Sequence, residues 1–290
     1  MKTYHIISNP TAGKNKSSKN LKKVQDYFQR RGVPFVTHIS MAERDATEIA
    51  RRLTSAGEND LIVLGGDGTL HEVLNGIVDP TACRLGLIPS GTGNDFAEKI
   101  GVPMDAEKAC EMILDGQTKP TDYLEVSGVR CMNVAGLGMD VDVLERCRKG
   151  KLKGKIKYLM CLVQSLFAFK GYKVEFEVNG KTQTRDVLIA AVCNGSQFGG
   201  GVKICPTAQV DDGKLDAIVI DCIGGKIKII KAFIELMKGR VLEYPLTQHI
   251  LCESIRFIPQ NECTVQLDGE LYKNLEFTAT VRQGLNFYRP

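Results

Sequence analysis

The stretch Leu61-Ile-Val-Leu-Gly-Gly-Asp-Gly-Thr-Leu-His-Glu-Val-Leu-Asn-Gly76 predicts a strand, a turn and a helix in immediate succession. Its first residues, 61–64, are all apolar and predict a short buried strand. The segment from Leu70 to Ile77 predicts a helix, and the hydroxyl of Thr69 can cap its first turn. A strand that leads through a short turn into a helix is the repeating unit of α/β proteins.

The turn of this stretch carries glycines on both sides of an aspartate. Gly65, Gly66 and Gly68 remove side chains at the end of the strand, so that a phosphate can approach the backbone and the free N–H groups of the helix. Asp67 lies inside the turn, and a carboxylate beside phosphates is expected mainly where a cation lies between them. We therefore predict an anion site. The alternative is an ordinary turn in which Gly and Asp serve steric needs alone.

A second turn of the same kind follows the next predicted strand, at 84–88. The sequence Pro89-Ser-Gly-Thr-Gly-Asn-Asp-Phe-Ala97 again opens a helix with small residues. Asp95 lies near the start of that helix and adds a second carboxylate at the same edge of the sheet. A helix-start aspartate often serves only the helix dipole, but two such turns on consecutive strands favour a functional site.

The rest of the chain divides into two halves of different pattern. Before about residue 120, strands alternate with amphipathic helices, which predicts a mostly parallel sheet. A strand at 3–8 leads into a turn of small residues, Asn9 to Gly13, at the same edge. After residue 120, short strands follow one another, with a hairpin at Asn179-Gly180 and a further glycine turn at 136–140. This half is predicted to be β-rich and antiparallel.

Composition limits the classes of protein that the chain can be. A hydrophobic share of 43% excludes wholesale disorder, and a net charge of +4 does not require nucleic acid but suits an anionic ligand or lipid surface. The 10 cysteines form no Cys-x-x-Cys pair, and the 4 histidines lie far apart. We expect free thiols in a reducing cytoplasm, not a zinc site. No signal peptide or membrane-spanning helix is expected.

Alternating lysines from Lys149 to Lys157 precede an apolar segment, Tyr158 to Phe169. Near an anionic membrane each lysine contributes about 1 kcal/mol to attraction, so this run predicts peripheral binding at the inner face of the membrane. A solvated loop is the alternative. The apolar segment is too short to span a bilayer and predicts a core helix, with an interfacial helix as the alternative.

Several motifs in order give the chain a recognisable resemblance. It resembles the soluble bacterial diacylglycerol kinases, relatives of the catalytic domain of diacylglycerol and sphingosine kinases. The resemblance covers nearly the whole chain. The motifs are Asn9-Pro10-x-x-Gly13, Gly65-Gly66-Asp67-Gly68-Thr69, Pro89-x-Gly91-Thr92-x-Asn94-Asp95-Phe96-Ala97, Gly136-x-Gly138-x-Asp140, Asp211-Asp212-Gly213-x-Leu215 and Leu267-Asp268-Gly269-Glu270.

The resemblance implies a nucleotide-binding α/β domain at 1–122 and a β-sandwich-like lipid-substrate domain at 123–290, with the extreme C-terminus returning to the first domain. It implies ATP and Mg²⁺ as cofactors and is compatible with a homodimer. Ser40 aligns with a threonine of the family. The residues expected to bind the nucleotide are Asn9, Pro10, Gly13, Ser40, Gly65, Gly66, Asp67, Gly68, Thr69, Glu72, Gly91, Thr92, Asn94 and Asp95.

The resemblance also implies a structural magnesium ion at Gln209, Asp212 and Lys214. Only Asp212 has a carboxylate, so Gln209 and Lys214 would contribute backbone carbonyls. A solvated Asp-Asp-Gly turn is the alternative.

The leading hypothesis is ATP-dependent phosphorylation of a lipid hydroxyl, with diacylglycerol converted to phosphatidic acid. Asp67 and Asp95 would organise catalytic magnesium, and Glu270 or Asp268 would act as base. Gly269 indicates a turn or a bulge after the strand predicted at 263–267, and a solvent-facing acidic hairpin tip is the alternative to a functional site. On an alternating strand Asp268 and Glu270 would share a face. We favour Glu270 for its longer reach, with Asp67 next in line. The alternatives are a kinase similar to NAD kinase and a lipid-binding regulatory protein without activity.

Overall fold

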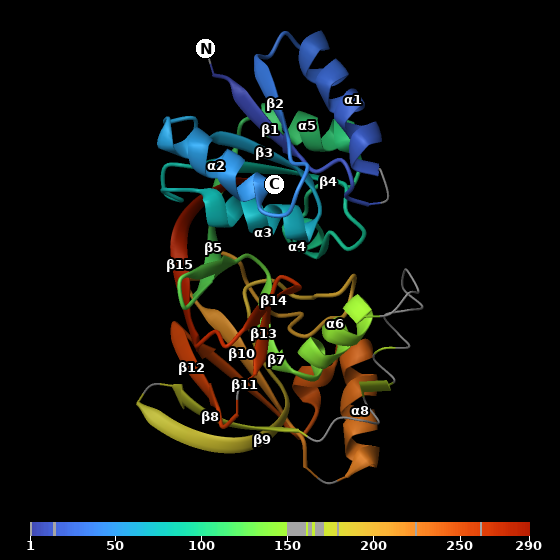
Figure 1. Cartoon of the computed structure of the whole chain (residues 1–290), viewed down its shortest axis with the longest axis vertical. Helices are drawn as coiled ribbons and strands as arrows, with labels where there is room; N and C mark the ends of the chain where they lie inside the picture. The colour runs from blue at the N-terminus through green and yellow to red at the C-terminus, as the bar shows by residue number, and fades with distance from the viewer. Residues whose placement is uncertain are drawn as a thin grey trace.

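The computed structural model describes residues 2–13, 16–149, 161, 164–165, 171–178, 180–223, 225–261 and 263–290. Figure 1 shows two lobes stacked along the long axis, with the first third of the chain in one lobe and most of the remainder in the other. Among the described residues, no helix is long and apolar enough to cross a bilayer. Lys151 to Lys157 and most of the predicted helix at 158–169 lie outside the described residues.

The first lobe contains the predicted parallel sheet. Its strands are β1 (Tyr4–Ser8), β2 (Phe35–Ile39), β3 (Asp60–Gly65) and β4 (Arg84–Pro89), in the order β2-β1-β3-β4. The buried residues 61–64 place β3 inside the core, because both faces of a parallel sheet are covered. The carboxyl ends of β1, β3 and β4 therefore meet at one edge.

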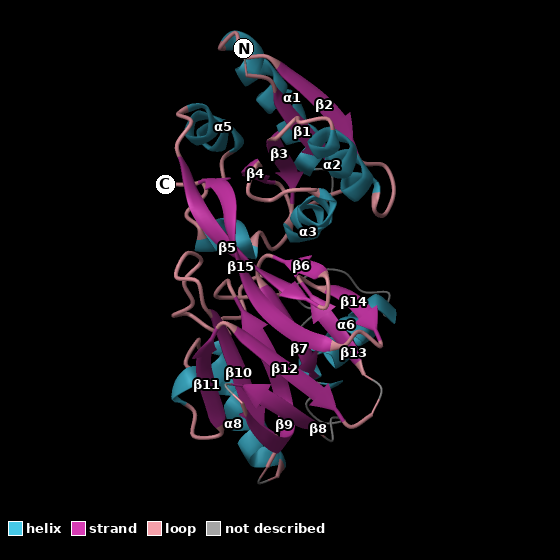
Figure 2. Cartoon of the chain, turned by 90° about the vertical axis from the view of Figure 1, so that its left-hand side faces the viewer, coloured by secondary structure: helices cyan, strands magenta, loops and turns pink. Residues whose placement is uncertain are grey.

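Helices cover both faces of this sheet. On one side α1 (Lys16–Arg30) packs against α5 (Ala106–Leu114), and on the other α2 (Asp45–Ser55) packs against α3 (Asp67–Gly76). The short helix α4 (Asp95–Lys99) follows β4. Right-handed strand–helix–strand connections produce this alternation of faces, and Figure 2 shows the helices flanking the strands.

The second lobe is antiparallel and β-rich, as predicted. Its strands pair in the order β14-β13-β7-β9-β8-β12-β15, and β10 and β11 extend from β9. The bounds are β6 (Val129–Cys131), β7 (Val134–Gly138), β8 (Tyr172–Val178), β9 (Lys181–Cys193), β10 (Leu215–Asp221), β11 (Thr247–Cys252), β12 (Ser254–Pro259), β13 (Thr264–Leu267) and β14 (Glu270–Lys273). Helices α6 (Met139–Lys149) and α8 (Lys226–Met237) and the 3₁₀ helix Val241–Glu243 complete this lobe.

Two long strands join the lobes. β5 (Thr118–Val126) leaves the first lobe, and β15 (Phe277–Tyr288) runs antiparallel to it and returns. The end of β15 pairs parallel to β4, with Asn286 opposite Arg84. Tyr288 is buried in the first lobe, where its hydroxyl donates to Asp60 at 2.9 Å. The last residues of the chain are therefore part of the first sheet.

Two local predictions were wrong. Helix α3 begins at Asp67 after Gly66, so Thr69 lies within its first turn and does not cap it. The segment at 136–138 belongs to strand β7 and is not a turn, because it pairs with both β9 and β13. Continuous hydrogen bonding on both sides overrides the flexibility of its glycines.

Candidate active site

A cavity of about 590 Å³ lies at the carboxyl ends of β3 and β4, where the lobes meet. Both lobes contribute to its walls. The lining residues are Asn9, Ala12, Gly66, Asp67, Gly68, Thr69, Glu72, Thr92, Gly93, Asp95, Asn133, Val134, Leu144, Cys147, Phe198, Gly199, Gly200, Gln266, Asp268, Gly269 and Glu270. The structure thus brings together motifs that lie up to about 260 residues apart in sequence (from Asn9 to Glu270).

The glycines of the three turns have two different environments. A Cβ on Gly13 would lie 2.0 Å from the carbonyl oxygen of Ser90, and one on Gly66 would lie 2.8 Å from the Cα of Gly91. These glycines let the turns pack on one another. A Cβ on Gly68 would meet Glu270 Oε1 at 3.8 Å and nothing closer among the described residues. Gly68 is therefore where the start of α3 opens to the cavity.

Asp67, the first residue of α3, holds the start of α4. Its carboxylate accepts hydrogen bonds from the backbone N–H groups of Asp95 at 3.3 Å and Phe96 at 3.2 Å. Asn94 precedes α4 with a φ of 58° and supplies no side-chain cap of its own. Burial raises the pKa of Asp67, the charge of Asp268 adds to the rise, and the backbone donors oppose it.

Asp95 is buried and faces the second lobe. Its carboxylate accepts from Gln197 Nε2 at 3.1 Å and from the backbone N–H of Gly200 at 2.8 Å. Burial, reinforced by the nearby charge of Asp67, raises its pKa to about 6. The point where Gly93 would carry a Cβ lies 3.1 Å from Asp67 Oδ2 and 3.3 Å from Asp95 Oδ2. Two carboxylates that converge and repel each other in this way fit a divalent cation.

Glu72 accepts a hydrogen bond from the start of α2, as Asp67 does from the start of α4. Its Oε2 accepts from the backbone N–H of Ala46 at 3.2 Å, and Arg44, at the start of α2, offers no side-chain cap. Burial raises the pKa of Glu72, and the charge of Glu270 contributes. Glu72 lines the cavity, but one of its oxygens is committed to α2.

Asp268 occupies a hairpin turn and not an alternating strand. It and Gly269 have φ values of 51° and 87° and connect β13 to β14, with Leu267 paired to Glu270. The expectation that Asp268 and Glu270 share a strand face was therefore wrong. Asp-Gly between two strands is a strong hairpin signal, and this signal was available in the sequence.

The carboxylate of Asp268 is almost fully used by the protein. Its side chain is 2% exposed and accepts from His71 Nδ1 at 3.0 Å, Cys131 Sγ at 3.1 Å and the backbone N–H groups of Met132 and Asn133, both at 2.8 Å. Burial acts to raise its pKa, but these donors, His71 first, hold the pKa below its ordinary value. Asp268 is therefore a buried anion that joins β13 to α3 and the segment after β6.

His71 is a site residue that sequence reasoning missed. Its Nδ1 meets Asp268, and its Nε2 lies 2.8 Å from the hydroxyl of Tyr272 on β14. It is buried at the contact between α3 and the hairpin. The signal was its position one turn after Asp67, which places both on one side of the helix.

Glu270 begins β14 and lies across the cavity from the glycine turn. It is half-buried, and its Oε1 is the atom closest to the open side of Gly68. Asn9 and Thr92 also line the cavity. Ser40 does not line it, and the Ser40 hydroxyl is buried without a partner among the described residues. Five predicted nucleotide-binding residues lie behind the wall, in the packed turns and their helix starts: Pro10, Gly13, Gly65, Gly91 and Asn94.

The predicted structural metal position lies apart from the cavity lining. Asp212 Oδ1 accepts from the backbone N–H of Lys214 at 3.0 Å, and the exposed Gln209 directs its side-chain amide to Thr207. A buried residue that sequence reasoning missed, Asp122, accepts from Gly213 N–H at 2.7 Å. Burial raises the pKa of Asp122, and the charges of Asp212 and Asp211 contribute. Two carboxylates at one turn suit a cation, although neither predicted neighbour offers a side-chain ligand.

Both lobes of this chain are similar to known protein domains. Residues 3–126 match the diacylglycerol kinase catalytic domain, and residues 133–285 match the YegS C-terminal NAD kinase beta sandwich-like domain. A diacylglycerol kinase of Bacillus subtilis is 30% identical over 93% of this chain and 90% of its own length. A YegS-like lipid kinase of Cronobacter sakazakii is 27% identical over 94% of this chain and 91% of its own length.

The fold is shared with solved structures as well. The crystal structure of a diacylglycerol kinase from Bacillus anthracis superposes with a TM-score of 0.76 at 23% identity, covering 100% of this chain and 97% of that one. The first domain matches the catalytic domain of diacylglycerol kinase. NAD kinase is named only for the β-sandwich type of the second domain. A kinase family implies ATP as the phosphate donor. The chain therefore belongs to the diacylglycerol kinase family of lipid kinases.

Proposed function

We propose that this kinase transfers the γ-phosphoryl group of ATP to the hydroxyl of diacylglycerol. The observation that carries the proposal is the cavity in which Asp67 and Asp95 face Glu270 across the meeting of the lobes. The name of the Bacillus subtilis relative supports diacylglycerol as the acceptor. Apolar residues of the same cavity, Val134, Leu144 and Phe198, suit an acceptor with acyl chains.

The start of α3 would position the phosphates. Gly68 leaves the backbone N–H groups there open to the cavity, and the helix dipole favours an anion. Asp67 and Asp95 would hold magnesium, which would neutralise charge on the transferring phosphates. The convergence of their carboxylates beside Gly93 supports this assignment.

Glu270 would accept the proton of the lipid hydroxyl. As that proton leaves, the hydroxyl oxygen bonds to the γ-phosphorus, and the bond from this phosphorus to the bridging oxygen breaks to release ADP. Asp268 is unsuited to this task because its oxygens already accept five hydrogen bonds from the protein. Its role would be to position His71 and the hairpin that carries Glu270.

A lipid substrate requires access to a membrane surface. Most of the predicted lysine run, Lys151 to Lys157, lies outside the described residues, but α8 offers a described surface of suitable character. Ile227, Ile234 and Met237 are 74%, 41% and 47% exposed, and the same helix carries Lys226, Lys228 and Lys231. Exposed apolar side chains beside lysines fit an anionic lipid interface. Sedimentation with anionic vesicles tests this: the pair Ile227→Asp and Ile234→Asp should weaken binding, and the exposed control Val78→Asp should not.

Asp212 is proposed to hold a second, structural magnesium ion together with backbone carbonyls of Gln209 and Lys214. The nearby Asp122 supports a cation there, since its carboxylate reaches the same turn and accepts from the backbone N–H of Gly213.

One assay tests the substrate directly. Purified protein is given labelled ATP and magnesium with diacylglycerol, sphingosine, ceramide, phosphatidylglycerol or NAD. We expect label in phosphatidic acid above all. Label in another lipid would overturn diacylglycerol as the acceptor, and label in NAD alone would overturn the lipid-site assignment.

A further inference from the structure

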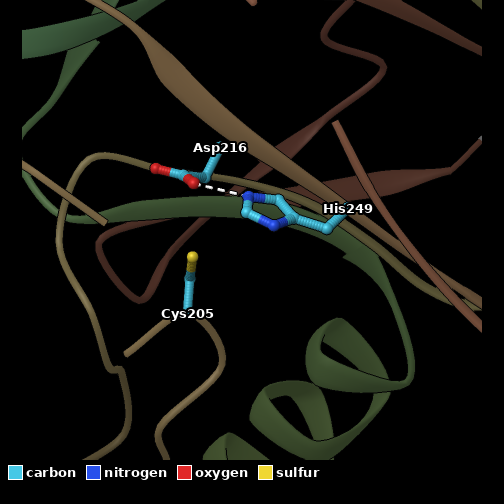
Figure 3. A group of neighbouring side chains, drawn as sticks. All are labelled: Cys205, Asp216 and His249. Atoms are coloured by element: carbon cyan, nitrogen blue, oxygen red, sulfur yellow. Dashed lines mark hydrogen bonds and ion pairs between the residues drawn. The ribbon is translucent and has the colours of Figure 1, made fainter. Parts of the chain in front are cut away.

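Three side chains of metal-binding type meet in the second lobe outside the residues that line the cavity. Cys205 Sγ, a carboxylate oxygen of Asp216 and a ring nitrogen of His249 all lie within 4.8 Å of one another. Figure 3 shows the three side chains turned toward a common point, with His249 Nε2 2.6 Å from Asp216 Oδ1. None of them belongs to the predicted site or to the inter-lobe contacts.

Strand pairing explains how two of these residues meet. Asp216 lies opposite Leu251, and Ile218 lies opposite His249, in the antiparallel pair of β10 and β11. Asp216 and His249 are therefore diagonal neighbours on one face of the sheet. Cys205 comes from the segment between β9 and β10, and its backbone N–H donates to Ser196 O at 3.1 Å. The scaffold thus fixes all three ligand groups without metal.

The spacing and exposure fit a bound cation. Zinc–sulfur, zinc–nitrogen and zinc–oxygen bonds of about 2.0–2.3 Å place tetrahedral ligands roughly 3.3–3.6 Å apart. The contact between His249 and Asp216 would have to open by less than about 1 Å. Cys205 and Asp216 are buried, whereas the side chain of His249 is 34% exposed. That exposure gives an entry path and leaves a fourth position for water.

We propose that Cys205, Asp216 and His249 form a binding site for a thiophilic divalent cation of the zinc type. A sulfur and an imidazole ligand select such ions over magnesium. Binding forms the metal–sulfur bond and releases the thiol proton to solvent, so affinity should increase with pH. Burial above all raises the pKa of Cys205 to about 12, so the metal-free thiol is not an activated nucleophile.

The position of the site suggests its consequence. The segment that carries Cys205 also carries Gln197 and Gly200, which donate hydrogen bonds to Asp95. A metal bond at Cys205 would tie this segment to β10 and β11. Metal binding should therefore stabilise the folded protein and lower the mobility of the wall behind Asp95.

Cobalt substitution tests the site without any assay of activity. The reduced full-length protein is freed of metal with a chelator and titrated anaerobically with Co²⁺, which reports a thiolate ligand through a sulfur-to-cobalt charge-transfer band. We expect the band to saturate at one thiolate-bound Co²⁺ per chain and to be removed by Zn²⁺, and we expect a rise in melting temperature with Zn²⁺. Cys205→Ser should remove the band, and His249→Gln should weaken binding at least about tenfold.

The matched control is Cys263→Ser, a partly buried cysteine of the same lobe that lies outside the cluster. It should retain both the band and the Zn²⁺-induced shift. A band that survives Cys205→Ser, or that disappears in Cys263→Ser, would overturn the proposal. Absence of the band in wild-type protein would also overturn it. If Cys205→Ser does not fold, undiminished binding by His249→Gln, which changes a partly exposed side chain, is the deciding negative result.

Discussion

The two rims of the cavity carry carboxylates whose pKa values are shifted in opposite directions. On the glycine-turn rim (residues 66–68 and 92–95), Asp67 and Asp95 accept backbone hydrogen bonds yet have raised pKa values. On the hairpin rim (residues 268–270), Asp268 is more deeply buried, but its pKa is lowered. The difference lies in the partners. Asp268 has His71 and several close donors. Asp67 and Asp95 lie near each other, and within the described part of the chain no cationic side chain forms a hydrogen bond or ion pair with either of them.

This difference teaches that burial alone does not decide the role of a carboxylate. A buried anion with a cationic partner and several donors serves structure, while converging anions without a cationic partner leave charge for a ligand to neutralise. Glu270, which adjoins Asp268 in the same hairpin, lies between these cases because it is half-buried and faces Gly68.

The largest effect is expected from Asp67→Asn. It removes charge from the glycine-turn rim while keeping an oxygen for the start of α4. We expect turnover to fall by roughly a thousandfold or more, the scale of losing one electrostatic partner of a transition state, with the circular dichroism spectrum unchanged. Asp26→Asn, on the exposed side of α1, is the control. Near-normal turnover in folded Asp67→Asn would remove Asp67 from the catalytic site.

Glu270→Gln should lower kcat at least about a hundredfold, because the amide cannot accept the hydroxyl proton, while the KM for ATP changes little. Steady-state kinetics with lipid in mixed micelles measure both parameters. If kcat stays within a few-fold of wild type, the base lies elsewhere, and Asp67 is the next residue to test.

Asp268→Asn should act mainly on stability. The amide cannot satisfy the donors that surround Asp268, and His71 loses its anionic partner. Breaking a buried charged contact of this kind costs about 3 kcal/mol or more of unfolding free energy. Urea unfolding measures the loss. A protein of wild-type stability with the kinetic defect predicted for Glu270→Gln would exchange the roles of the two residues.

The raised pKa of Asp95 makes the glycine-turn rim sensitive to pH. Because its folded pKa is about 6, above the unfolded value, its contribution to stability is present below about pH 4 and is lost as pH rises through 6. Asp95→Asn removes this loss. The melting temperature of the variant, relative to that of the wild type, should therefore increase as the pH is raised from 4.5 to 7.5. This relative increase corresponds to at most about 3 kcal/mol of unfolding free energy. A constant difference across this range would contradict the raised pKa.

The smallest effect is expected away from both rims, at Asp212. Asp212→Ala should lower the melting temperature by a few degrees, of the order expected for about 1 kcal/mol, and remove part of its dependence on magnesium. Metal analysis and thermal scans with and without magnesium provide the measurement, with the ion-paired Asp211→Asn as control. If neither metal content nor melting temperature changes, no structural ion is held there.

In the parallel half of the fold, the strand bounds predicted from local sequence lie close to those of the structure. Strand β3 is one residue longer than predicted at each end, and β4 is one residue longer at its carboxyl end. The agreement is close because apolar runs bounded by glycine and helix-start residues are local signals. The same signals identified the turns that hold Asp67 and Asp95. The short strand β14 and the strand β11 were missed, since each depends on pairing with a partner strand more than on its own residues.

Tertiary structure alone decided which side chains meet. Asp268 and Glu270 are two residues apart, yet the left-handed turn between them places the Asp268 carboxylate among buried donors, whereas Glu270 faces Gly68 across the cavity. His71 contacts Asp268 across a separation of 197 residues. Asp216 and His249 meet because β10 pairs with β11, and the segment between β9 and β10 brings Cys205 to them. Sequence sets the chemistry and the local period of each segment. Contacts between distant segments depend on the packing and register of the whole sheet, which no local pattern encodes.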